Sequence, residues 1–349
     1  MDMMRDSAEF LATLSPGRRE RRLAAAVVLV SAAVFLVAAP FAKVPLPQVW
    51  PFIPIYESAL VINDLITAAL LFGQFSILRM RSLWVLASGY LFTAFMTIPH
   101  ALTFPGVFAP SGLLGAGPQS TAWMYTLWHG GFPFCVIAYA LLKGEAREAL
   151  LSRINPRAAV LSGIAAALVT VCGLTFLATV VGDALPAMLL NNRYTPLGIT
   201  MLSSVWVLSA LALTVLWRRR PHSVLDLWLM VVMCAWLFDI GLSAVLNAGR
   251  FDLGWYAGRI YGLLAASFVL LVLLLENGAL YARLVDMYRQ LQYTRALEAQ
   301  VSERERAEVE TRRVNVELEE RVRQRTGCRW PPTPPPSGLR PARRHPSRR

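Results

Sequence analysis

Apolar residues fall into eight long blocks between Leu23 and Asn277, and short polar connections separate these blocks. A helix needs about 20 predominantly apolar residues to cross the hydrocarbon core of a bilayer, and each block reaches or approaches that length. The blocks are Leu23–Phe41, Tyr56–Leu78, Ser82–Ile98, Thr121–Leu142, Ala158–Val181, Leu197–Trp217, Val224–Leu246 and Trp255–Glu276. The pattern predicts an all-α, polytopic membrane helical bundle of about eight transmembrane helices.

A charged segment follows the last block, from Ala279 to Arg325, and contains neither Gly nor Pro. Its apolar residues recur at spacings of three, four and seven, which is typical of a coiled coil. They are Leu280, Leu284, Met287, Leu291, Leu297, Val301, Val309, Val316, Leu318 and Val322. We expect a cytoplasmic coiled-coil helix through which two copies of the chain form a homodimer. A single solvated helix is the alternative.

The last stretch, 326–349, is dominated by proline and arginine. Such a composition neither continues a helix nor buries a core. One interpretation is a disordered basic tail attracted to anionic lipid. The interpretation that we favour is translation out of frame. The sequence thus divides into a basic N-terminus (1–22), an eight-helix membrane domain (23–278), a cytoplasmic helix (279–325) and this tail.

The positive charge is placed unevenly along the chain. The net charge is +12, but the basic residues lie in short connections and in the tail, so topology rather than a nucleic-acid partner explains them. Fourteen Lys and Arg residues lie in the N-terminal segment and in alternate connections, against three in the remaining connections. Cytoplasmic loops are enriched in Lys and Arg, so both termini are predicted to lie in the cytoplasm.

The connection Pro99–Ser120, on the predicted outer side, is rich in Gly and Pro and has no Lys or Arg. It also carries apolar residues that a solvated loop would not need. They are Leu102, Phe104, Val107, Phe108, Leu113 and Leu114. We expect this connection to fold back onto the helix ends, either as a fixed connector or as a moving lid.

Six ionisable residues lie between the predicted midplane and the outer surface. An ionisable side chain inside a membrane costs at least a few kcal/mol, so each needs a partner or a function. They are Glu57, Asp64, His100, His129, Asp239 and Arg259. One hypothesis is a polar pocket that binds a small ligand or senses a membrane stimulus. The other is internal pairing that fixes helix packing, in which Asp239 binds Arg259. A second such pair would join Asp64 to His129.

Two further acids, Asp226 and Glu276, lie at predicted inner ends, where we expect them to reach water. A metal or haem site is not expected, because His100 and His129 alone are too few ligands to indicate one. No pair of cysteines has metal-ligand spacing. The sequence therefore predicts neither a metal nor another cofactor.

Three stretches carry a resemblance to a known family: IPIYESALVINDLITAALLFGQF (53–75), SGYLFTAFMTIPHALTFPGVFAPSGLLGAGPQSTAW (88–123) and WHGGFPFCVIAYALLK (128–143). They closely resemble the membrane-associated sensor family of MASE type, fourth class. Members are bacterial multi-span input domains joined to cytoplasmic histidine kinase or diguanylate cyclase modules. The resemblance implies a sensory role in the bacterial inner membrane, and it makes Asp64, His100 and His129 better site candidates.

The segment LEERVRQRT (318–326) looks like the linker that leads into the dimerisation helices of sensor kinases. Beyond it the chain departs from the family pattern. It has no phospho-accepting histidine in a dimerisation helix, no Gly-rich ATP lid and no GGDEF signature. We therefore expect a sensory input module that is not itself an enzyme. A small-molecule or ion transporter is the alternative, although its usual repeat between the two halves is not evident.

Overall fold

The computed structural model describes residue 12, residues 14–143 and residues 155–326. These residues form two compact units, which divide between Leu280 and Tyr281. The first unit contains eight helices that are long and apolar enough to cross a membrane, which confirms the predicted membrane bundle. The elements in chain order are α1 (Arg18–Ala38), η2 (Ala39–Phe41), α2 (Phe52–Leu78), α3 (Arg81–Thr103), α4 (Ser120–Leu142), α6 (Pro156–Thr179), η3 (Gly182–Ala184), β1 (Leu189–Leu190), β2 (Arg193–Tyr194), α7 (Pro196–Arg218), α8 (Val224–Ile240), the π-helix η4 (Gly241–Val245) and α9 (Leu253–Thr326).

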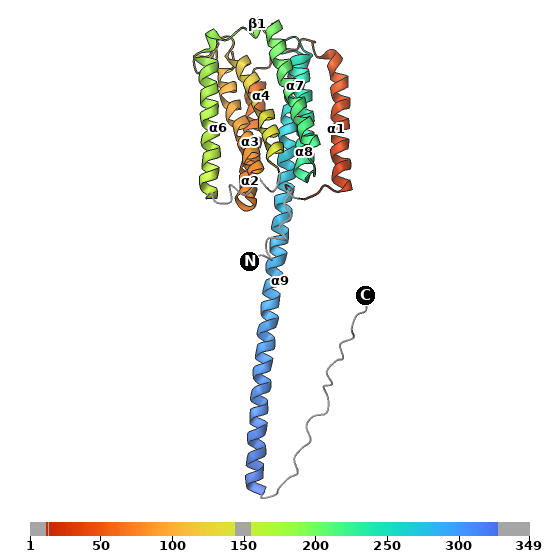
Figure 1. Ribbon diagram of the computed structural model, residues 1–349, viewed down its shortest axis with the longest axis vertical. Coiled ribbons are helices and arrows are strands. Elements are labelled where there is room, and N and C mark those ends of the chain that lie inside the picture. Colours follow the sequence, from red (N-terminus) through yellow and green to blue (C-terminus); the bar gives the residue numbers. More distant parts are fainter. Residues whose placement is uncertain (1–11, 13, 144–154, 327–349) are drawn as a thin grey trace. The chain divides into compact units, whose positions relative to one another are not determined.

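The helices of the membrane unit pack in an order that differs from their order in the chain. Helix α3 lies between α2, α4 and α6, and α4 also packs on α7. Helix α8 lies between α7 and α1, which stands at one edge of the bundle (Figure 1). Only Ala24 of α1 is buried, so most of this helix faces outward. Helices α3 and α8 are consequently the most enclosed, and both carry candidate site residues.

The part of α9 that belongs to the membrane unit packs against the first two helices and α8. The Asn63 amide of α2 donates a hydrogen bond of 2.9 Å to Ser267, and Tyr261 donates one of 2.7 Å to the carbonyl of Ser31 in α1. The Tyr261 ring also stacks edge-on against Phe238 of α8. Hydrogen bonds between membrane helices add to close packing in holding such a bundle together. Helix α9 is therefore an integral part of the bundle.

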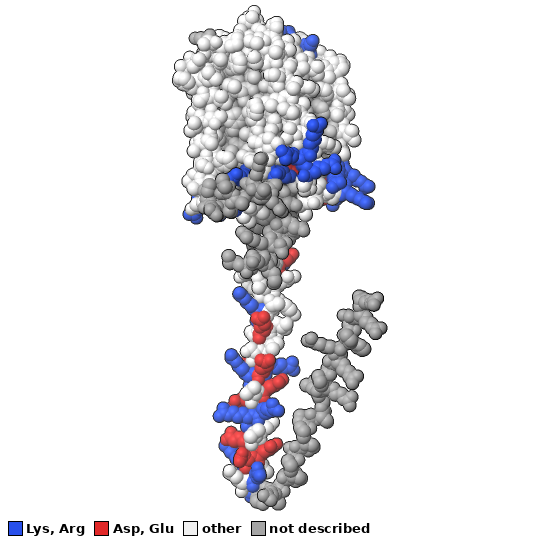
Figure 2. All heavy atoms as spheres, viewed as in Figure 1, with Lys and Arg blue, Asp and Glu red and all other residues white. Residues whose placement is uncertain are grey.

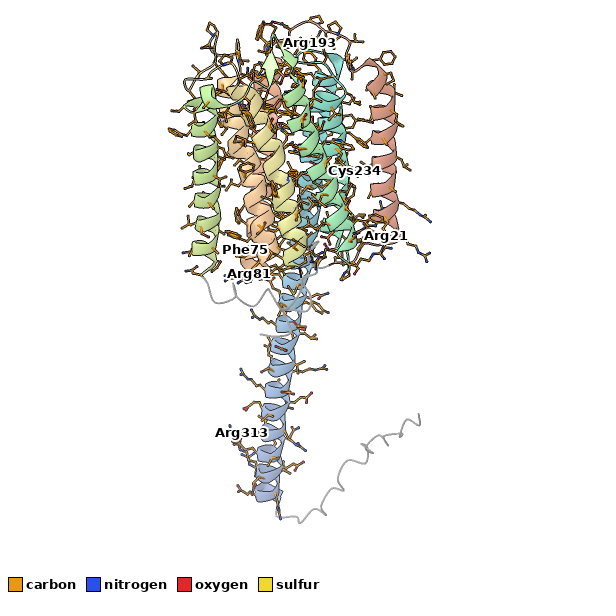
Figure 3. The ribbon with its side chains drawn as sticks, turned by 45° about the horizontal axis from the view of Figure 1, so that its top comes forward. Arg21, Phe75, Arg81, Arg193, Cys234 and Arg313 are labelled. Carbon is orange, nitrogen blue, oxygen red and sulfur yellow. The ribbon has the colours of Figure 1, made fainter. Side chains whose placement is uncertain are left out.

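The two ends of the bundle differ in charge. Figure 2 shows the Lys and Arg residues of the membrane unit gathered mainly at one end, which we call the basic end. Figure 3 shows Arg21 and Arg81 at this end and Arg193 at the opposite end. The opposite end, which we call the loop end, also carries the two-stranded sheet of β1 and β2. The predicted basic residues Arg5, Arg147 and Arg153, and the tail 327–349, lie outside the described residues.

Helix α3 is longer than predicted, because it continues through Pro99 to Thr103. The hydroxyl of Thr103 donates to the carbonyl of Pro99 at 2.8 Å and belongs to the extra turn. His100, which we expected to end the span at the outer surface, is therefore inside the helix and only 2% exposed.

The connection from Phe104 to Gln119 covers the loop end only in part. Phe104 is buried and packs with Ile53, Phe251 and Trp255, as the fold-back hypothesis requires. Gly112 has φ of 86°, and a Cβ there would lie 2.3 Å from the carbonyl oxygen of Thr103, so only glycine fits this close approach. However, three of the apolar residues expected to pack inward are exposed, so that part of the expectation is wrong. They are Phe108, Leu113 and Leu114.

Candidate functional site

The first buried pair of the site joins α2 to α3 near the loop end. The Nδ1 atom of His100 lies 2.7 Å from Oε1 of Glu57, and both side chains are only 2% exposed. The second oxygen of Glu57 has no hydrogen-bond partner among the described residues. Rings of Phe104, Tyr125 and Trp128 surround the histidine. A buried carboxylate next to an imidazole can hold or release a proton, which a purely apolar contact cannot do.

Asp64 lies near the middle of α2 and contacts α3 rather than α4. Its Oδ2 atom accepts a hydrogen bond of 2.5 Å from the hydroxyl of Thr93. The predicted pairing of Asp64 with His129 is therefore wrong. The physical reason is that α3 packs directly against α2, and Thr93 presents a donor at the depth of Asp64.

His129 of α4 instead pairs with Asp239 of α8. Its Nε2 atom lies 3.4 Å from Oδ2 of Asp239, and its Nδ1 atom lies 2.9 Å from the main-chain carbonyl of Tyr125. A carbonyl only accepts hydrogen bonds, so Nδ1 carries a hydrogen. In a neutral ring Nε2 would then be a bare acceptor facing the carboxylate. A second proton, on Nε2 or on Asp239, is needed for the two groups to attract each other.

The second oxygen of Asp239 extends this pair into a longer network. Its Oδ1 atom accepts a hydrogen bond of 3.1 Å from Ser243, whose hydroxyl is also 2.7 Å from the Tyr125 hydroxyl. Tyr194, just before α7, donates to the carbonyl of Ser243 at 3.1 Å. Ser243 lies in the π-helix η4, a distortion that is frequent at functional sites. The network thus links α4, α8 and the sheet at the loop end.

Two glycines of α9 lie close to the Asp239 carboxylate. A Cβ at Gly258 would lie 2.9 Å from Oδ1 of Asp239, and one at Gly262 would lie 3.0 Å from its Oδ2. A Cβ at Gly262 would also lie 2.8 Å from the Tyr56 hydroxyl. Small residues let membrane helices approach closely. The backbone of α9 therefore lies close to the Asp239 carboxylate.

Arg259 does not bind Asp239, the pair that the internal-pairing hypothesis named. Its guanidinium lies 3.8 Å from the ring centre of Trp255 and 5.5 Å from that of Tyr125. One of its NH groups donates a hydrogen bond of 2.9 Å to the carbonyl of Trp255. The prediction was wrong because Asp239 is already engaged by His129 and Ser243. Aromatic faces attract the cation in place of a carboxylate.

A second arginine, Arg250, lies close to Arg259 at the loop end. Its guanidinium is 4.9 Å from the ring centre of Phe104. The pKa of Arg250 is lowered to about 10, mainly by burial and in part by the positive charge of Arg259, while Tyr194 acts in the opposite direction. Burial also raises the pKa of the Tyr194 hydroxyl, which the two arginines partly offset. Both shifts indicate a dry, positively charged region outside the spans.

A small cavity lies among the central polar residues. It has about 10 Å³ for the centre of a water molecule, which is room for about one water. Asp64, Thr93, His129 and Asp239 line it. Three further lining groups, the Tyr90 hydroxyl and the indole NH groups of two tryptophans, have no hydrogen-bond partner among the described residues. The tryptophans are Trp128 and Trp236. A site of this size admits a proton or a water, not a metabolite.

Asp226, which we expected to reach water at the basic end, is fully buried. It forms an ion pair with Lys143 and accepts a hydrogen bond of 2.8 Å from the Tyr139 hydroxyl. Its Oδ2 atom also accepts the main-chain NH of Ser223 at 2.6 Å, and Ser223 caps α8 in return. The expectation was wrong because the capping box at the start of α8 turns the side chain inward. The Glu276 side chain lies outside the part of the chain that the structure describes.

The six predicted residues therefore lie in two adjoining groups. Asp64, His129 and Asp239 surround the central cavity, while His100 and Arg259 line a second cavity closer to the loop end. Glu57 joins the second group through His100. Thr93, Tyr125 and Ser243 were not predicted as site residues, although a hydroxyl group inside an apolar block is a signal that could have indicated them. Within the described ranges, no three His, Cys, Asp or Glu side chains are grouped as metal ligands.

Comparison with known families places these groups in a recognised domain. The family described as "Membrane-associated sensor, integral membrane domain" (MASE4) matches residues 47–281. The match contains all six predicted residues and begins after α1. Comparisons with curated proteins and with solved structures find no match. Because the matched region makes up more than half of the sequence, the chain belongs to the MASE4 family of integral membrane sensors.

Proposed function

We propose that this protein is the membrane-embedded sensory input module of a bacterial signal-transduction protein in the inner membrane. Its output would be a histidine kinase or a diguanylate cyclase. The observation that carries the proposal is the contact of Gly258 and Gly262 with Asp239. Helix α9 begins at Leu253 and extends without interruption to Thr326, beyond the matched domain. A change at the buried carboxylate is thereby coupled to the helix that leaves the domain.

The proposed mechanism is a two-state change in hydrogen bonding. Loss or gain of the proton between His129 and Asp239 converts attraction between the two groups into repulsion. Charges in a dry interior interact strongly, so the new state favours a different position of the Asp239 side chain. Gly258 leaves no room for even a Cβ beside Asp239, so a new position of this side chain would displace α9. A stimulus that shifts this equilibrium then shifts the population of output states.

The orientation that this mechanism needs has both termini in the cytoplasm. The concentration of Lys and Arg at the basic end supports it, because such residues are retained inside (Figure 2). The loop end would then face the periplasm, and the two groups of polar residues would lie between it and the bilayer midplane. A stimulus from outside would reach these residues first.

A chimera of residues 1–326 with a cytoplasmic histidine kinase tests the proposal. We expect His129→Ala and Asp64→Ala to change the basal kinase output several-fold, since each removes a partner in the central network. Autophosphorylation in cells and membrane insertion by fractionation are the two measurements. The parent chimera also tests the orientation, because the kinase reaches ATP only if α9 leads into the cytoplasm.

The matched control is Thr170→Ala, which removes an exposed hydroxyl of α6 that bonds only its own helix. Its output should equal that of the parent chimera. Parent-level output from both His129→Ala and Asp64→Ala, with normal insertion, would exclude the central network as the sensory element.

We also propose that two copies of the chain dimerise through the second unit. In its helix, residues 281–326, the members of the predicted apolar stripe whose side chains the structure describes are exposed: Met287 is 42% and Leu291 44% exposed. Exposed apolar stripes at this spacing are characteristic of coiled-coil partners. In a chain lacking its native cysteines, Leu291→Cys should crosslink between copies. Tyr293→Cys, about 200° around the helix, should crosslink far less, and equal yields from both positions would contradict the dimer.

A further inference from the structure

The guanidinium groups of two arginines, one buried and one half-buried, line a single cavity near the loop end. The cavity is lined by Arg250 and Arg259 together with His100, Thr121, Tyr125 and Tyr194. Arg259 is only 5% exposed. A buried charge without compensation costs several kcal/mol, and two like charges that lie close together cost more. The structure must therefore offer a negative partner here, either from the protein or from outside.

The protein does not supply that partner within the described residues. The nearby Asp252 binds Arg193 at 3.3 Å and the main-chain NH of Ala248 at 3.2 Å. Glu57 is bound to His100, and Asp239 to His129. In this part of the chain, no carboxylate lies within ion-pair distance of either cavity arginine. The two positive charges therefore line the same cavity without a carboxylate partner among the described residues.

The hydrogen-bonding capacity of the two arginines is also largely unused. A guanidinium has five NH donors in one plane. Among the described residues, Arg259 uses one of them, toward the carbonyl of Trp255, and the Arg250 side chain uses none. The faces of both groups are covered by aromatic rings, those of Trp255 and Tyr125 for Arg259 and that of Phe104 for Arg250. The in-plane edges, where donors point, remain available for an acceptor.

The size of the cavity limits what the acceptor can be. The volume open to the centre of a water molecule is about 20 Å³, which is room for roughly one or two waters. The Tyr125 and Tyr194 hydroxyls already bond to Ser243. The two arginines are therefore the main groups that can bind an acceptor in this cavity. A metabolite with a carbon chain does not fit in such a space. A single small ion does.

We propose that this cavity binds one small monovalent anion, a halide or a planar oxyanion of the size of nitrate or formate, between Arg250 and Arg259. Arginine favours planar oxyanions, because two parallel NH donors match two oxygens. The anion would offset one of the two positive charges and bridge the segment before α9 to α9 itself. This inference deepens the proposed function by naming a ligand class, and it rests on that function only for the link to signalling.

Thermal unfolding of the full chain in lipid nanodiscs tests the site. Nitrate, formate or chloride replaces gluconate at constant ionic strength, since gluconate is too large for the cavity. At saturation we expect at least one of the small anions to raise the unfolding midpoint by about 5 °C. Arg250→Gln and Arg259→Gln should each abolish this shift.

Lys43→Gln is the matched control, because it removes one exposed positive charge from the same end without touching the cavity. It should keep the full shift. Equal shifts in all variants, or none in the parent chain, would overturn the proposal. If an arginine variant fails to fold, calorimetric titration of the parent chain with nitrate decides: one saturable site supports the proposal and none refutes it. These measurements do not use the kinase chimera. A negative result would therefore refute the anion site without contradicting the proposed sensory function.

Discussion

Replacing Asp226 with alanine is expected to lower the free energy of unfolding by about 3–5 kcal/mol, the usual cost of breaking a buried ion pair. The carboxylate is fully buried and serves four donors: Lys143, the Tyr139 hydroxyl, and the main-chain NH and hydroxyl of Ser223. Alanine would leave Lys143, which is only 17% exposed, without its partner. Unfolding in dodecyl sulfate, followed by circular dichroism, measures the difference.

The exposed ion pair of the second unit provides the matched control for Asp226. Glu317 and Arg321 lie 2.9 Å apart, but their side chains are 62% and 71% exposed. Water and salt screen such a pair, so Glu317→Gln should leave stability unchanged. A loss in Asp226→Ala no larger than in Glu317→Gln would show that the carboxylate does not join α4 to α8.

Substituting alanine for Gly258 is expected to cost about 1–3 kcal/mol of stability and to change the basal output of the kinase chimera. The added Cβ would lie 2.6 Å from the Cβ of Ser243 and 2.7 Å from the carbonyl oxygen of Asp239. Backbone atoms cannot rotate away, so α9 or α8 has to shift. The same unfolding assay and autophosphorylation measure the two effects.

Gly73→Ala in α2 is the control for this substitution, since a Cβ there meets nothing within 4 Å. Alanine also loses less backbone entropy than glycine on folding, so Gly73→Ala should stabilise the protein by about 0.5–1 kcal/mol. Its kinase output should be that of the parent chimera. If Gly258→Ala behaved like Gly73→Ala, the contact between α9 and the network would have no mechanical role.

The bundle could be predicted from the sequence because the bilayer imposes a simple rule. A run of about 20 apolar residues has few structures open to it other than a spanning helix. Boundaries were less certain: the block ending at Ile98 omitted the turn that holds His100, because Pro99 usually ends a helix in water. The depth of a residue in the membrane follows from its place in its span, so the six candidates could be chosen in advance.

The partners of those candidates could not be predicted, because pairing depends on which helices touch and on which faces. Asp64 and His129 lie at similar depths, yet Asp64 faces Thr93 and His129 faces Asp239. Arg250 was counted only as one of three basic residues on the predicted outer side. Its position beside Arg259 arises from the fold-back at the start of α9, where Phe251 and Trp255 pack with Phe104. No spacing in the sequence encodes that contact.

The most direct test is a distance measurement between spin labels on α7 and α9 in a chain lacking its native cysteines. Val207 and Leu275 suit the labels, because they are 60% and 66% exposed. If the His129–Asp239 pair sets the position of α9, His129→Ala should shift the distance distribution, while Thr170→Ala should leave it at the parent value. Identical distributions in the parent chain and in His129→Ala would contradict the coupling on which the proposed sensory mechanism depends.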